Sequence, residues 1–426
     1  MSMKWLGFVA ALLIAMAGWG QEAPAAPLTL AQCLQLALEH QADVQIGQRA
    51  VVSAQARATK AASSYYPQIA LANSNRLARA GAVAPISNST TGLTVSQTFY
   101  DGGIREANVK GAKAGVTQST AALQRTRQAV IFAVTRDYYA LLRAAKLAEV
   151  QDARVTLLTE QRDQITTRVQ AGDAAQVDSY PVEAQLANAQ VDRLSAQNTV
   201  RTAALALQNT MGLEPREGFT VQDVPLPAPQ EPAPLAQLLQ TALTLRPDRQ
   251  QTQAGTLAAK YGTQAAKIAL APRPVVTGDF SQPLLSGDRH SMTIAGGLAY
   301  NLFDGGAARA DYRAAKSAQE TAELQAQQLV NDIRTDVQTA YLDLQNARDR
   351  LAASALSVQA ARRNADAQTE RYRLGLAIPL DLLNAQVDLA TAQSNEAQAR
   401  YDYLTALAQL DFAVGTQGEP REDTQK

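Results

Sequence analysis

The sequence predicts a mainly α-helical fold with a small β part, made of two similar halves. Three observations support this prediction. Sequence motifs recur about 200 residues apart, two helical stretches run for nearly seventy residues each, and short segments alternate between apolar and polar residues. A repeat, long helices and a few strands together indicate an elongated molecule rather than a compact domain.

The N-terminus has the pattern of a secretory signal peptide. Lys4 precedes an apolar run over 6–17, and small residues at 15–17 and 23–25 offer two candidate cleavage sites. We assign residues 1–22 to the signal and leave its end open. An uncleaved anchor is the alternative, but the run is shorter than the ~20 residues that a spanning helix needs.

Composition narrows the functional classes. The chain has 426 residues, a formal net charge of zero and 5% aromatic residues. It lacks the basic stripe of a nucleic-acid binder, so we expect no nucleic-acid partner. Cys33 is the only cysteine, which excludes an intrachain disulfide. No apolar run directly precedes it, so we expect a buried helical residue there rather than a lipid-attachment site.

An Asp-Gly-Gly motif marks the repeat. It occurs first at Asp101, Gly102 and Gly103, and it returns 203 positions later at Asp304, Gly305 and Gly306. The same offset relates further identical pairs: Val134 and Val337, Tyr138 and Tyr341, Gly172 and Gly375, and Asp178 and Asp381. Upstream of Pro67 the offset is 205, so a two-residue change falls between Pro67 and Asp101, where we expect a loop. We infer an internal duplication.

The repeat sets the domain boundaries. The first repeat covers 27–213 and the second covers 235–414. Between them, 214–234 is rich in proline and predicts an extended linker. A polar tail, 415–426, ends the chain.

Each half has the same predicted order of elements. A first helix (about 30–63 and 235–269) leads to two short strands and the Asp-Gly-Gly turn. A very long helix follows, over about 104–170 and 307–373, and at 1.5 Å per residue it extends about 100 Å. A glycine then ends it, and a last helix returns antiparallel to it, to about 210 and 412. We therefore expect long antiparallel helical hairpins.

The strand segments alternate with period two. Apolar residues occupy alternate positions in two runs: Leu93, Val95 and Phe99 in the first, and Met292, Ile294, Leu298, Tyr300 and Leu302 in the second. Weaker partners lie at 68–71 and 276–280, and we expect loops at 76–89 and 284–290. Four strands cannot close a barrel, so strands in a membrane require several chains to share one. The alternative is a periplasmic coiled-coil scaffold or adaptor without a pore, its sheet capping a helical rod.

Four segments carry a resemblance to the TolC-like outer-membrane efflux proteins. They are 302–306 (LFDGG), 371–376 (RYRLGL), 380–386 (LDLLNAQ) and 399–404 (ARYDYL). The resemblance implies a homotrimer whose twelve-stranded β-barrel contacts outer-membrane lipid and whose helices form a periplasmic barrel. It also implies an exit duct that meets a periplasmic adaptor (a membrane fusion protein) and an inner-membrane pump or secretion ATPase.

Glycines mark both predicted helical tips. Gly172 and Gly375 each end a long helix, as expected for a residue in the left-handed region. The resemblance places the adaptor contact at these loops, which comprise Ala171, Gly172, Asp173, Leu374, Gly375 and Leu376.

Carboxylates follow each tip. Asp178 and Asp381 begin the returning helices, where negative charge favours the helix N-terminus. The resemblance assigns Asp381 to an acidic ring in the pore constriction, with Asp178 nearby. Asn384 stands where the family has a second gate aspartate, so the ring carries less charge here.

In the family that the sequence resembles, contacts between side chains hold the tip closed, and we call these contacts the lock. The lock residues of this sequence depart from the family pattern. Tyr372 matches a lock residue and Asp178 matches a carboxylate partner, but Ala377 stands where the family has an arginine. Arg373 or Arg371 is a candidate substitute. The lock is therefore the part of the resemblance that transfers least directly.

No catalytic or metal-binding pattern is present. His40 and His290 lie far apart, without metal-ligand spacing, and the Asp-Gly-Gly turns suit a strand-to-helix corner better than a phosphate site. We expect no metal, no cofactor and no enzymatic activity. The cargo, whether a drug, a metal ion or a protein, is not encoded in any motif.

Overall fold

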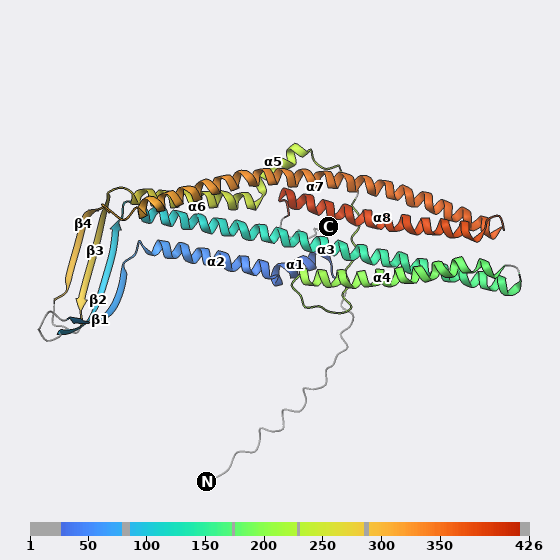
Figure 1. Ribbon diagram of the computed structural model, residues 1–426, viewed down its shortest axis with the longest axis horizontal. Coiled ribbons are helices and arrows are strands. Elements are labelled where there is room, and N and C mark those ends of the chain that lie inside the picture. The colour runs from blue at the N-terminus through green and yellow to red at the C-terminus, as the bar shows by residue number, and fades with distance from the viewer. Residues whose placement is uncertain (1–26, 79–85, 173–174, 228–230, 285–288, 418–426) are drawn as a thin grey trace, which may run out of the picture.

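The computed structural model describes residues 27–78, 86–172, 175–227, 231–284 and 289–417. The molecule is elongated, with its helices running along the long axis (Figure 1). The strands lie at one end and the turns between long helices lie at the other. The predicted signal peptide, Asp173 and most of the predicted polar tail fall outside the described residues.

The same order of elements occurs in both halves. The first half contains α1 (Leu30–His40), α2 (Ala42–Ser63), β1 (Gln68–Ala78), β2 (Ile86–Tyr100), α3 (Ile104–Ala171), a 3-10 turn (Gln176–Asp178) and α4 (Tyr180–Thr210). The second contains α5 (Leu235–Leu245), α6 (Pro247–Ala269), β3 (Arg273–Pro283), β4 (Ser291–Ala299), α7 (Ala307–Arg373) and α8 (Pro379–Val414). The prediction of a mainly helical protein with a small β part is confirmed.

The first helix of each half differs from the prediction because it is broken. Gln41 and Arg246 both adopt extended backbone conformations, with ψ of 126° and 123°. Arg246 precedes Pro247, and the ring of a proline disfavours helical geometry in the residue before it. At Gln41 the side-chain oxygen accepts a hydrogen bond from the backbone N–H of Asp43, which starts α2 afresh.

The strands form one antiparallel sheet in the order β1-β2-β3-β4. β1 and β2 extend further than expected, because pairing continues to Ala78 and Ile86 where the sequence predicted a loop. The last apolar positions of the predicted fourth strand, Tyr300 and Leu302, instead follow the end of β4. β1 and β4 are the outer strands, so each has one edge without a partner in the described sheet.

The core lies midway along the helices, where α1 and α5 pack. Ala37, Val134, Ala242 and Val337 are all fully buried, and they occupy equivalent positions in the two halves. Cys33 is also fully buried on α1, as expected, and burial raises the pKa of its thiol to about 11.

The buried side chain of Arg246 connects three helices of the second half, α6, α7 and α8. Arg246 is 4% exposed, and its guanidinium donates to the carboxylates of Asp248 and Asp336 and to the carbonyl of Ala413. The nearest contacts to the carboxylates are 2.6 Å and 2.9 Å. This network ties the break between α5 and α6 to α7 and to the end of α8.

Candidate functional site

The sheet has one apolar and one polar face. Paired residues point to the same side, so the register places Ile69, Val95, Phe280 and Met292 together across all four strands. On the outer strands this face is open to the surroundings: Leu71 is 68% exposed, and Ile69 and Met292 are 70% and 73% exposed. The opposite face carries polar residues in register: Ser96, Asp279 and Thr293. An apolar face this exposed requires a lipid or protein surface to cover it.

The two Asp-Gly-Gly turns have the same geometry. The Asp101 carboxylate accepts hydrogen bonds from the backbone N–H groups of Gly103 and Arg105, at 3.1 Å and 2.9 Å. The Asp304 carboxylate accepts equivalent bonds from Gly306 and Ala308, both at 2.9 Å. The bonds from Ala308 and Gly306 hold the pKa of Asp304 below its usual value.

The glycines of these turns have positive φ angles of 79° and 98° at Gly102 and Gly103, and 68° and 91° at Gly305 and Gly306. Each turn therefore redirects the chain from a strand into a long helix. The carboxylates cap helices, as the sequence indicated for a strand-to-helix corner.

Both predicted tips lie at the end of the molecule opposite the sheet (Figure 1). α3 ends at Ala171, and Gly172 follows with a φ of 81°. α7 ends at Arg373, and Gly375 has a φ of 72°. Leu374 and Leu376 are 57% and 66% exposed. The tip thus presents two short loops, one of them with exposed leucines.

The candidate gate residues lie just beyond these loops. Asp381 and Asn384 are exposed and three positions apart in the first turns of α8, so they share one side of the helix. Asp178 ends the 3-10 turn before α4, and its carboxylate accepts a hydrogen bond from the backbone N–H of Ala175 at 3.2 Å. Asp178 and Asp381 therefore occupy equivalent places in the two hairpins.

A cross-hairpin contact at the tip was not anticipated from the sequence. Arg168, near the end of α3, donates from Nη1 to the hydroxyl of Tyr372 on α7 at 3.2 Å. Its guanidinium also lies 5.9 Å from the centroid of the Tyr372 ring. Arg168 and Arg371 are equivalent positions of the repeat, 203 residues apart. Because Arg371 was a candidate lock residue, the repeat could have identified Arg168 as a candidate too.

The other tip arginines have local partners. Arg373 forms a two-pronged ion pair with Glu370 on the same helix, at 2.7 Å and 2.9 Å, and this pairing lowers the pKa of Glu370. Arg371 donates to the carbonyl of Leu376 at 3.4 Å. Tyr372 thus makes the contact between hairpins, whereas Arg373 stabilises its own helix.

Apolar packing supports that contact further along the hairpins. Leu383 of α8 is 3% exposed and packs with Val155 and Leu158 of α3. Gln161 of α3 donates a side-chain hydrogen bond to Gln386 of α8. Near the tip, a buried cluster and these two polar contacts therefore join the two hairpins of one chain, and the ion pair between Arg143 of α3 and Asp402 of α8, at 3.1 Å, joins them again further from the tip.

Within the described ranges, no group of three or more His, Cys, Asp or Glu side chains is arranged to hold a metal ion. Over the same residues, no helix has an apolar stretch long enough to cross a bilayer.

Comparison with known proteins gives the family. The sequence profile described as "Outer membrane efflux protein" matches residues 33–213 and again 238–416, which together make up most of the chain. The chain belongs to this family. This outer membrane efflux protein is accordingly an exit duct of the outer membrane, with a large periplasmic part.

Individual relatives agree with this assignment. The outer membrane efflux protein BepC of Brucella suis is 25% identical, over 83% of this chain and 78% of its own. TolC of Vibrio cholerae is 24% identical, over 85% of this chain and 84% of its own. The structure of the outer-membrane channel OprN has the same fold, with a TM-score of 0.80 at 21% identity, covering 92% of this chain and 91% of that one.

Proposed function

We propose that three copies of the chain share one twelve-stranded β-barrel in the outer membrane and one helical tube in the periplasm. The observation that carries this proposal is the sheet, whose exposed apolar face extends across all four strands and whose outer strands each have an open edge. Open edges are not tolerated in lipid, so the outer strands require partners from other copies. Three copies with four strands each provide the twelve strands of such a barrel.

The two halves of the tube are, in this proposal, products of a duplication. The same order of elements, the equivalent buried residues and the two separate matches to the family profile support it. Two similar hairpins per chain, one ending at each tip loop, give a tube of six hairpins in a trimer.

The tip would contact a periplasmic adaptor, with an inner-membrane pump or secretion ATPase behind it. The loops that contain Gly172 and Gly375 support this placement, because they form the end of the molecule furthest from the sheet and the Gly375 loop presents two exposed leucines, Leu374 and Leu376. Small molecules or secreted polypeptide would pass through the duct without covalent chemistry.

Asp381 would form an acidic ring at the narrow end of the duct. Its carboxylate is exposed at the start of α8, and threefold symmetry would bring three copies of it around one axis. Carboxylates gathered in this way attract cations and repel anions. Asn384, on the same side of the helix, adds no charge to this ring.

Planar-bilayer conductance of the detergent-purified oligomer tests both parts of the proposal. We expect cation-selective channels in the wild type and weaker cation selectivity in Asp381→Asn. Asp343→Asn removes an exposed carboxylate in the middle of α7 and serves as the matched control. Unchanged selectivity in Asp381→Asn would reject the ring and keep the duct. Failure of a folded oligomer to insert into the bilayer would favour a scaffold without a pore.

A further inference from the structure

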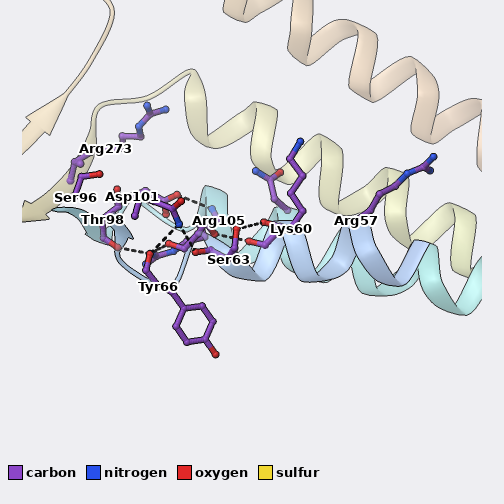
Figure 2. Close-up of a pocket in the computed structure, with 14 residues that line it drawn as sticks. Arg57, Lys60, Ser63, Tyr66, Ser96, Thr98, Asp101, Arg105 and Arg273 are labelled. Carbon is purple, nitrogen blue, oxygen red and sulfur yellow. Dashed lines mark hydrogen bonds between the residues drawn. The ribbon is translucent and has the colours of Figure 1, made fainter. Parts of the chain in front are cut away.

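A hollow of about 780 Å³ lies where the helices meet the polar face of the sheet (Figure 2). Its walls come from the last turns of α2, the first turns of α3 and the ends of β1, β2 and β3 nearest the helices. Gln68, Ser96 and Arg273, which contribute to its sheet side, all belong to the polar face by register. The hollow therefore opens on the side of the sheet opposite the apolar, lipid-type face.

Positive charge predominates around this hollow. Arg57, Lys60, Arg105 and Arg273 line it, and Asp101 is the one acidic residue among the lining residues. The Asp101 carboxylate is already engaged by two backbone N–H groups at the start of α3. Four cations against one hydrogen-bonded carboxylate leave the hollow with excess positive charge.

Three of these cations have no ion pair within the described part of the chain: Arg57, Lys60 and Arg273. The Nε atom of Arg273 is buried and has no hydrogen-bond acceptor among the described residues. Figure 2 shows Arg57 and Lys60 along α2, with Arg273 at the end of the sheet. A buried donor without an acceptor is costly, so an anion in the hollow would stabilise it.

Arg105 has a different role. It donates to the backbone carbonyls of Ser64, Thr98 and Phe99, and it lies 4.2 Å from the ring centroid of Tyr65. Arg105 therefore holds the corner between α2, β2 and α3 together. Its charge contributes to the hollow, but its substitution would disturb the fold.

The second half of the chain provides an internal comparison. The equivalents of Arg57 and Lys60 in α6 are Gly262 and Ala265, and the equivalent of Arg105 is Ala308. A Cβ added at Gly262 would meet no atom within 4 Å, so space does not exclude a larger side chain there. In the second half, the same strand-to-helix corner thus forms without any of these cations. In the first half, Arg105 has become part of the corner, but the side chains of Arg57 and Lys60 make no hydrogen bond or ion pair within the described residues, so their positive charge is not required by the fold.

We propose that this hollow binds a multiply charged anionic solute, one that carries phosphate groups or clustered carboxylates. Arginine and lysine are the residues that recognise such groups. The inference rests on the proposed barrel, in which the polar face lines the lumen and the hollow lies at the base of the barrel. Each of three copies would place one such site on the route of the cargo, opposite in charge to the acidic tip.

Isothermal titration of the detergent-purified oligomer with inorganic pyrophosphate tests this site. We expect saturable binding that weakens with added salt, and a loss of affinity of about fivefold per removed charge in the double variant Arg57→Gln/Lys60→Gln. Both side chains are exposed, so the variant is expected to fold. The matched control Arg49→Gln/Lys113→Gln removes two exposed cations outside the hollow and should bind as the wild type does. Absence of saturable binding to the wild type, or an equal loss in the control, would overturn the proposal.

A second titration distinguishes a dissolved anion from a lipid headgroup. Short-chain phosphatidylglycerol, added in the same detergent, should not compete with pyrophosphate if the hollow opens to the lumen. Competition that disappears in Arg57→Gln/Lys60→Gln would place the hollow against lipid and overturn the lumen site. Pyrophosphate binding by a folded oligomer that does not insert into bilayers would retain the anion site and reject the duct, so the two failures are distinguishable.

Discussion

We propose that the contact between Arg168 and Tyr372 holds the tip closed, and replacing Tyr372 with phenylalanine tests this proposal. The substitution removes only the hydroxyl that accepts the hydrogen bond from Arg168, at 3.2 Å. The ring remains to pack, and Arg168 is exposed, so water can solvate the released guanidinium. The change therefore weakens the link between the two hairpins of one chain without leaving a buried group unpaired.

The size of the effect follows from the geometry of this contact. A hydrogen bond to a charged donor at a solvated position contributes about 0.5–1 kcal/mol. If three copies open together, the closed state loses about 1.5–3 kcal/mol, which raises the ratio of open to closed channels by about tenfold to about 150-fold. If opening required the loss of this contact in only two of the three copies, the ratio of open to closed channels would rise by less.

Single-channel recording in planar bilayers measures this ratio directly as open probability. Arg373→Gln is the matched control, because Arg373 pairs with Glu370 on its own helix and makes no contact between hairpins in the described structure. We expect a higher open probability in Tyr372→Phe and an unchanged one in Arg373→Gln. An open probability in Tyr372→Phe equal to that of the wild type would refute this account of the lock, as would an equal rise in the control.

Three further predictions concern stability and insertion. Arg246→Met should lower the free energy of unfolding by about 3–5 kcal/mol, seen as a lower melting temperature, because two carboxylates lose a buried partner. Gly102→Ala should destabilise more than Gly305→Ala: both have positive φ, but only at Gly102 does the new Cβ approach another side chain, to 2.9 Å. Equal melting temperatures would contradict this. Met292→Lys on the apolar face should impair assembly into outer membranes, by up to about 2–4 kcal/mol at mid-membrane depth. Thr293→Lys on the polar face should be tolerated, and membrane fractionation followed by immunoblotting distinguishes the two.

The sequence predicted the long helices well because local signals define them. Both helices begin after an Asp-Gly-Gly turn and end before a glycine with positive φ, and both features are visible in the sequence. The break before Pro247 was missed, although proline disfavours helix in the preceding residue. The equivalent break at Gln41 has no such marker, since it depends on one side-chain hydrogen bond.

Contacts between distant segments could not be predicted in the same way. The pairing of Arg168 with Tyr372 joins residues 204 positions apart, so it depends on how two hairpins pack. The basic hollow likewise gathers Lys60 and Arg273 from separate elements. The lengths of β1 and β2 were underestimated because the parts of these strands furthest from the helices lack the alternation of apolar and polar residues that marks the parts next to the helices. The roles of Asp381 and Gly375 stay predictions.

Disulfide cross-linking between the two open sheet edges tests the shared barrel most directly. Ala72→Cys in β1 would be combined in turn with Thr293→Cys, Ala295→Cys and Gly297→Cys in β4, which sample three registers on the polar face. The native Cys33 is fully buried and does not interfere. After oxidation of outer membranes, we expect a covalent species of three chains on denaturing gels for at least one pair of cysteines, and none for the single variants. Absence of cross-links in every register, or a ladder that continues beyond three chains, would contradict it.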